Sequence, residues 1–114
     1  MNRVYTDPDP VLFPTIHATK KAIEAEHERG KLFAYTDLHG HATKRGCFVF
    51  GNSSADSESH IQQMLFPKLM SLNCVNFDFS ECSFSDEANN KKDLKGDSRE
   101  GSGRAAIYKM TNCP

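Results

Sequence analysis

Two histidines and an aspartate stand close together near the middle of the chain, in the run Asp37-Leu38-His39-Gly40-His41. The run ends an apolar stretch, residues 31–38, whose length favours a buried strand over a helix. A loop that follows a buried strand is a place where a rigid scaffold delivers functional side chains. Histidine there can bind a metal ion, and a neighbouring carboxylate can fix its tautomer. A loop with two solvated histidines is the alternative, because this combination of residues is common.

A catalytic zinc ion needs three protein ligands and one open position, and the other two ligands are not evident in the sequence. No HxxE or HExxH motif occurs, because none of the five histidines is followed by Glu three positions later. Glu24 and His27 share one face of an expected helix, but a solvated face explains them better among so many charges. The sequence therefore predicts one metal ligand in this chain and not three.

The sequence gives less support to a phosphate-binding loop or to a serine or cysteine nucleophile. Residues 100–104, Glu-Gly-Ser-Gly-Arg, lack the GxxxxGK[ST] spacing of a phosphate-binding loop and precede an apolar run. No GxSxG motif occurs, and Cys47 lies in an apolar run that is expected to raise its pKa and reduce its reactivity. The four cysteines form no CxxC pair, so with no secretory signal we expect free thiols in a reducing compartment.

The length, the net charge and the apolar runs of the chain limit its possible partners and location. The chain has 114 residues, enough for one domain, and a formal net charge of -1. Nucleic-acid or anionic-membrane binding shows as a basic excess, so neither partner is expected. No apolar run approaches the roughly 18 residues that a membrane helix needs. Together with the free thiols, this indicates a cytoplasmic protein, with the nucleus as a further location.

The elements that would position these residues are both helices and strands. Residues 15–29 should form a surface helix that ends at Gly30. A second helix should begin at Asp56 or Ser57, with a kink or a break at Pro67. Short apolar runs predict strands at residues 31–38 and 47–50 and the end of a further strand at residues 104–108. The alternation of Phe77 and Phe79 with polar residues predicts another short strand.

Several parts of the sequence resemble the cytosolic carboxypeptidases, a family of zinc metallopeptidases that includes tubulin deglutamylases. The resembling residues are 35, 37–41, 44–48, 51–52, 64–69, 76–79 and 100–109. The resemblance implies an α/β fold, a mixed sheet flanked by helices, of which this chain would hold only a part. Residues 1–114 are then an internal piece of a single zinc carboxypeptidase catalytic domain, with the polar residues 83–102 as a mobile surface loop.

The resemblance also implies roles for particular residues. His39 corresponds to the third zinc ligand of the family, the one that follows an HxxE pair along the chain. Asn2 and Arg3 resemble the pair that grips the C-terminal carboxylate of the substrate, a task that suits the planar fork of arginine. Tyr108 matches the catalytic tyrosine that closes over the bound residue, and Arg104 is a further candidate for recognising an acidic side chain.

The implied function is deglutamylation, the removal of glutamates from polyglutamylated protein tails such as those of tubulin, with one zinc ion as the cofactor. In the family the HxxE ligand pair precedes the position of Asn2, and the catalytic glutamate follows that of Tyr108; this chain contains neither. We therefore expect the chain to be inactive alone. A protein that only binds acidic tubulin tails, and a different zinc hydrolase such as an acyl-amino-acid deacylase, remain as alternatives.

Overall fold

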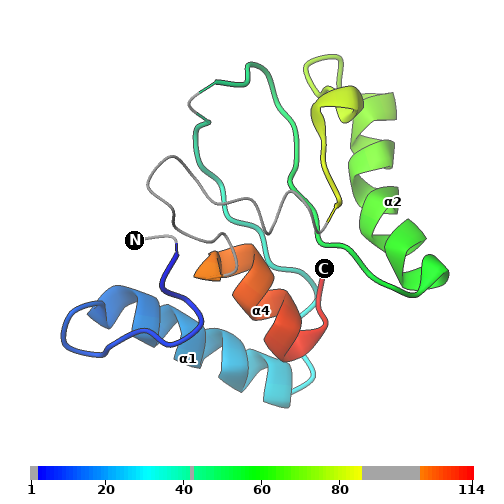
Figure 1. The fold of residues 1–114 in the computed structure, drawn as a ribbon. Coiled ribbons are helices and arrows are strands. Elements are labelled where there is room, and N and C mark those ends of the chain that lie inside the picture. Colours follow the sequence, from blue (N-terminus) through cyan, green and yellow to red (C-terminus); the bar gives the residue numbers. More distant parts are fainter. Residues whose placement is uncertain (1–2, 42, 86–100) are drawn as a thin grey trace. The chain divides into compact units, whose positions relative to one another are not determined.

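A computed structural model describes residues 3–41, 43–85 and 101–114. The regular structure of these residues consists of α1 (Pro14–Glu28), α2 (Ser57–Asn73), the short 3-10 helix η1 (Phe79–Glu81) and α4 (Gly103–Thr111), shown in Figure 1. The chain divides into two compact units. We call Met1–Asp37 with Asn89–Pro114 the terminal unit, and Leu38–Ala88 the central unit.

Helix α1 of the terminal unit confirms the first predicted helix. Pro14 occupies its first turn, where the missing N–H costs nothing. Gly30 follows the helix with φ of +66°, a conformation that glycine adopts without strain. None of the residues of α1 is buried, and ion pairs such as Lys21–Glu24 lie on its surface. The helix therefore presents a charged face to water while it contacts α4 (Figure 1).

Helix α4 shows that the expected strand end at residues 104–108 was wrong. The run contains two alanines, which are the strongest helix formers. The buried positions Gly103, Ile107 and Thr111 recur at every fourth residue, as on one side of a helix. Asn112 then ends the helix in a left-handed conformation, with φ of 54°. Five residues were too few to reveal this helical repeat.

Helix α2 of the central unit confirms the second predicted helix and its start. The Asp56 carboxylate accepts the N–H of Ser59 at 2.8 Å and so caps the helix. Pro67 lies inside α2 and is buried. A kink or a break was expected there, and the helix continues past the proline without a break. The proline removes one backbone hydrogen bond, and the bonds on either side of it maintain the helix. Helix α2 packs on η1 within its own unit.

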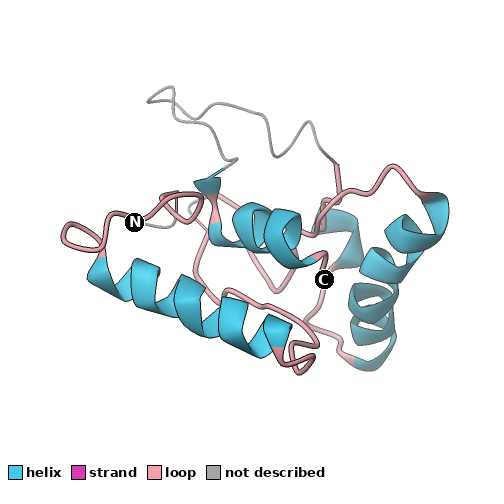
Figure 2. Cartoon of the chain, turned by 90° about the horizontal axis from the view of Figure 1, so that it is seen from below, coloured by secondary structure: helices cyan, strands magenta, loops and turns pink. Residues whose placement is uncertain are grey.

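The expected mixed sheet flanked by helices is wrong for the described residues, which contain no strand (Figure 2). In the central unit, residues 47–50 do lie beside residues 77–83, but in two isolated parallel bridges, Cys47 with Phe77 and Phe50 with Ser83. Between the bridges one segment advances by three residues and the other by six. Helix η1 takes up the difference, so a regular ladder of hydrogen bonds cannot continue.

Residues 31–38, expected as a buried strand, are neither a strand nor buried. Phe33 is 91% exposed and Leu38 is 89% exposed. Tyr35 donates its N–H to the carbonyl of Pro114 at 2.9 Å, but no strand among the described residues pairs with the segment. Because a strand exists through its backbone pairing, an apolar run alone does not make one. Most of the loop expected at residues 83–102 lies outside the described residues.

Candidate functional site

His39 lies in the central unit, in a stretch of chain without regular structure, and its side chain is exposed. The boundary between the units passes between Asp37 and Leu38, so Asp37 belongs to the terminal unit. The boundary between the two units therefore falls inside the run 37–41, which contains both histidines. An exposed imidazole in such a place is accessible to a ligand that comes from outside the described residues.

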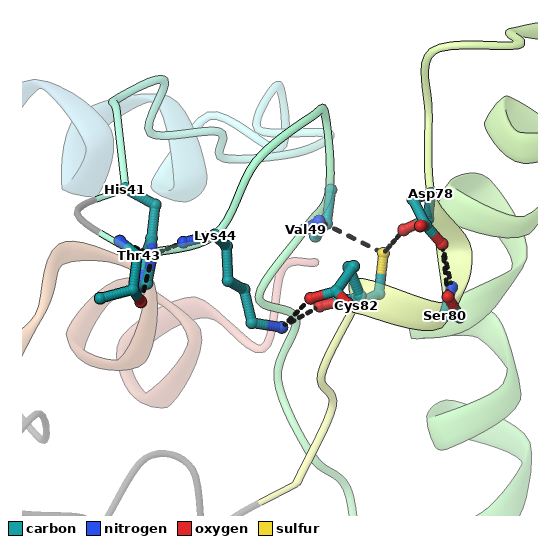
Figure 3. A network of polar contacts seen from close by, with 8 residues as sticks. His41, Thr43, Lys44, Val49, Asp78, Ser80 and Cys82 are labelled. Atoms are coloured by element: carbon teal, nitrogen blue, oxygen red, sulfur yellow. Dashed lines mark hydrogen bonds and ion pairs between the residues drawn. The ribbon is translucent and has the colours of Figure 1, made fainter.

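His41, two residues further on, is held by its own loop (Figure 3). Its Nδ1 accepts the backbone N–H groups of Lys44, at 3.1 Å, and Thr43, at 3.3 Å. A ring nitrogen that accepts hydrogen bonds carries no proton, so in the neutral ring the proton lies on Nε2. The ring also packs against Phe48 and Phe50, with centroids 5.6 Å apart in each case. His41 has a structural role, which leaves His39 as the candidate metal ligand of the pair.

Lys44 fastens the same loop to η1, as Figure 3 shows. Its Nζ donates to the carbonyl oxygen of Glu81 at 2.6 Å and lies 2.9 Å from the carboxylate oxygen Oε2 of that residue. The ammonium also lies 5.1 Å from the ring centroid of Phe48 and 5.6 Å from that of Phe50. Sequence reasoning missed this role, because only the fold brings Lys44 to a partner 37 positions away.

A second group of polar contacts fixes η1 itself. Asp78 Oδ1 accepts hydrogen bonds from the hydroxyl of Ser80 at 2.5 Å and from its N–H at 2.9 Å, and these hold the pKa of the Asp78 carboxyl below its usual value. Cys82 Sγ accepts the N–H of Val49 at 3.3 Å, and burial raises the pKa of its thiol. A thiol with a raised pKa stays protonated near neutral pH, so Cys82 is a poor nucleophile.

The described residues do not provide a complete metal site. Among residues 3–41, 43–85 and 101–114, no three His, Cys, Asp or Glu side chains are grouped so that they could hold a metal ion. A zinc ion bound by His39 would need two further protein ligands, and no described side chain offers them. The described residues alone therefore do not fit a zinc ion.

In the terminal unit, the chain around Arg3 lies against the residues that precede α4. Tyr5 donates its N–H to the carbonyl of Gly101 at 3.0 Å. The Gly101 backbone is so close to Arg3 that an added Cβ would collide with the Arg3 carbonyl oxygen. Glycine is needed at this position because two backbone segments meet there. The contact brings Arg3, which is half-buried, to the start of α4. Asn2 lies outside the described residues.

Arg104 and Tyr108 lie one turn apart on α4. Residues four positions apart are neighbours on a helix surface, about 5–6 Å between Cβ atoms. Both side chains are half-buried and adjoin the row that contains Ile107, which has no exposed surface. The structure therefore gathers Arg3, Arg104 and Tyr108 in one unit, whereas His39 belongs to the other.

Two tyrosines support the terminal unit close to its boundary at Asp37. The side chain of Tyr35 interacts with that of Tyr5, which is buried. Burial, and next the interaction with Tyr5, raise the pKa of the Tyr35 hydroxyl well above its ordinary value. The group therefore stays protonated at neutral pH. Sequence reasoning missed the pair, because two tyrosines this far apart in a chain form no local pattern.

No family model matches the chain. It is 55% identical to cytosolic carboxypeptidase-like protein 5 of Rattus norvegicus over 78 residues, which is 68% of this chain and 9% of that protein. It is 35% identical to cytosolic carboxypeptidase 3 of Mus musculus over 115 residues, which is 96% of this chain and 10% of that protein. A continuous match of either extent must include the middle of the chain, and with it His39 and α2.

These relatives place the protein in the class of carboxypeptidases. The chain belongs to the cytosolic carboxypeptidase family. It spans about a tenth of the length of the curated relatives it matches. Their names refer to the cytosol, in agreement with the cytoplasmic location expected from the sequence. No described helix is long and apolar enough to cross a bilayer. A carboxypeptidase family of this kind implies a metal cofactor, which the described residues do not fit alone.

Proposed function

We propose that this chain contributes to a zinc metallocarboxypeptidase that removes glutamates from polyglutamylated protein tails such as those of tubulin. Membership of a carboxypeptidase family supports cleavage at the C-terminal end of a peptide. The observation that carries the choice of an acidic substrate lies in the terminal unit, where Arg3 and Arg104 come from two segments that meet at Gly101. Each guanidinium can donate two parallel hydrogen bonds to one carboxylate.

Each residue has a separate task in this proposal. Arg3, together with Asn2, binds the C-terminal carboxylate of the substrate, and Arg104 binds the side-chain carboxylate of its last glutamate. A buried carboxylate loses its hydration, so an arginine partner is needed to offset that cost. Tyr108, one turn after Arg104, covers the bound residue. His39 supplies one ligand of the zinc ion, and the remaining ligands and the general base are assigned to parts of the relatives outside the shared segment.

A protein that binds acidic tails without cleaving them is the second candidate. The described residues favour it in one respect, because they hold two arginines in one unit but no group of three metal ligands. In that case Arg3 and Arg104 are needed for binding, and His39 is dispensable. The two candidates therefore differ in what they require of His39.

A chimera tests the proposal. The 78-residue segment of rat cytosolic carboxypeptidase-like protein 5 that matches this chain is replaced by the corresponding residues of this chain. We expect the chimera, like the unmodified rat protein assayed beside it, to release glutamate from a polyglutamylated tubulin-tail peptide. His39→Ala should abolish release and lower the zinc content measured by mass spectrometry. His60→Ala, a matched histidine variant on α2, should change neither.

Three outcomes would decide against parts of the proposal. Equal zinc content in the His39 and His60 variants would remove His39 from the ligand set. A chimera that binds the peptide but releases no glutamate would favour the second candidate. Glutamate release by the isolated 114-residue chain with added zinc would mean that it forms a complete site, which the described residues do not indicate.

A further inference from the structure

Helix α2 exposes a row of large apolar side chains. The row consists of Ile61, Leu65, Phe66, Leu69 and Leu72, each between 47% and 70% exposed, and Val75 beyond the helix, which is 99% exposed. Most of these residues recur at spacings of three and four, so they share one side of the helix. Pro67, the buried residue of α2, lies on the opposite side. The helix therefore turns its more apolar side away from its own unit.

The charges of α2 argue against two kinds of partner for this face. The helix has a single acidic residue, Glu58, and a single lysine, Lys68. The Lys68 ammonium lies over the ring of Phe79, 5.0 Å from its centroid, and so points to its own unit. A helix that binds a membrane surface carries several Lys and Arg residues beside its apolar face. A partner that is recruited by charge needs complementary charges.

An apolar face with so few charges is typical of a permanent protein contact, whose centre resembles the interior of a domain. Helix α1 shows the contrast within this chain, because its exposed surface is covered by charged residues and ion pairs. The partner that fits α2 is therefore an apolar protein surface that stays in place.

The relatives indicate which polypeptide would provide this apolar surface. Helix α2 lies inside the sequence shared with both relatives, and the shared segment is 9% of one and 10% of the other. We propose that the exposed face of α2 packs against polypeptide that the cytosolic carboxypeptidases carry outside this segment. In the complete proteins the face is then interior and not solvent-exposed. This inference goes beyond the proposed activity and does not depend on it.

Matched charge substitutions test the proposal. Ile61→Glu places a carboxylate on the apolar face, and Ala55→Glu adds the same charge at an exposed position just before α2. In the isolated chain both positions are exposed, so both variants should leave the Tm unchanged. In the chimera with the rat protein, Ile61→Glu should lower the Tm and reduce soluble yield several-fold, because it would bury an unpaired charge. Ala55→Glu should change neither.

Sedimentation velocity of the isolated chain separates this occupant from a second copy of the chain. A monomer, together with the effect of Ile61→Glu in the chimera, supports the proposal. A dimer that Ile61→Glu dissociates would overturn it in favour of self-association. Equal yield and Tm for the two chimera variants would overturn it as well. None of these readouts requires glutamate release, so a failure of the proposed activity is distinguishable from a failure of this inference.

Discussion

The two units hold their candidate site residues by different means. In the terminal unit α4 is fixed by burial, since Ile107 has no exposed surface and Gly101 lies against the backbone of Arg3. In the central unit the contacts that hold the loop after His39 include the ion pair of Lys44 with Glu81, close to the surface. Contacts between exposed charges weaken with salt, whereas buried apolar packing does not depend on charge. The comparison teaches that the packing of α4 depends on burial, whereas that of the His39 loop depends in part on charge.

Ile107→Ala should have the largest effect, because it removes a fully buried side chain from the packing of the terminal unit. We expect the free energy of unfolding, measured by urea denaturation, to fall by about 2–5 kcal/mol. The Tyr5 amide, which bonds to Gly101, should lose protection from hydrogen exchange. A loss as small as that of an ordinary surface substitution, within about 0.5 kcal/mol, would mean that burial does not fix α4.

Gly101→Ala should come next, because the new Cβ collides with the Arg3 carbonyl oxygen and the two segments must separate. The expected loss of stability is about 1–3 kcal/mol, as for other overpacked sites. Gly40→Ala is the matched control, since nothing lies within 4 Å of a Cβ at that position. If both variants were equally stable, the close approach of Arg3 to α4 would not matter for the terminal unit.

Lys44→Met should have a smaller effect, confined to the central unit. The side chain of Lys44 is 31% exposed, so solvent screens its ion pair with Glu81, and we expect a loss of about 1 kcal/mol or less. Hydrogen exchange should become faster at the amides of Asp78 and Ser83, which bond to the loop. In about 1 M salt the difference from the original protein should shrink, because the Debye length is then about 3 Å. An equal difference at low and high salt would contradict the comparison of the units.

The smallest expected effect is the contribution of Asp78 to the pH dependence of folding stability. Hydrogen bonds from Ser80 lower the pKa of this carboxyl in the folded protein, below its usual value of 3.8. A lowered pKa means that the stabilisation is present above the unfolded-state pKa and is lost as the pH falls through the folded-state value. Asp78→Asn cannot titrate, so its stability should fall less steeply below about pH 4. Identical acid profiles for the two proteins would show that these hydrogen bonds contribute nothing to folding.

Local signals were enough to predict the two long helices. Pro14 and Gly30 mark the ends of α1, and Asp56 caps α2, so both helices could be placed from their own residues. The strands were wrong because a strand needs a partner segment, and neither apolar content nor alternation supplies one. Residues 31–38 have no paired strand among the described residues, and residues 47–50 meet a neighbour that η1 interrupts.

The sequence predicted individual residues of the candidate site, but not which of them lie in the same unit. The roles of His39, Arg3, Arg104 and Tyr108 came from a resemblance and stay predictions. Arg3 shares a unit with Arg104 and Tyr108 through the backbone contact at Gly101. No spacing in the sequence predicts that contact. The contacts that Lys44 and Tyr5 make were missed for the same reason, because their partners lie far along the chain.

The terminal unit is discontinuous: the whole central unit lies in sequence between its two parts. Residues 38–88 are therefore synthesised before α4. The central unit can fold at a stage when α1 has no α4 to pack against. A central unit that has already folded shortens the flexible loop that must close when Tyr5 meets Gly101, which lowers the entropic cost of closure. We expect the contact between the segments that carry Arg3 and Arg104 to be among the last parts of the chain to form.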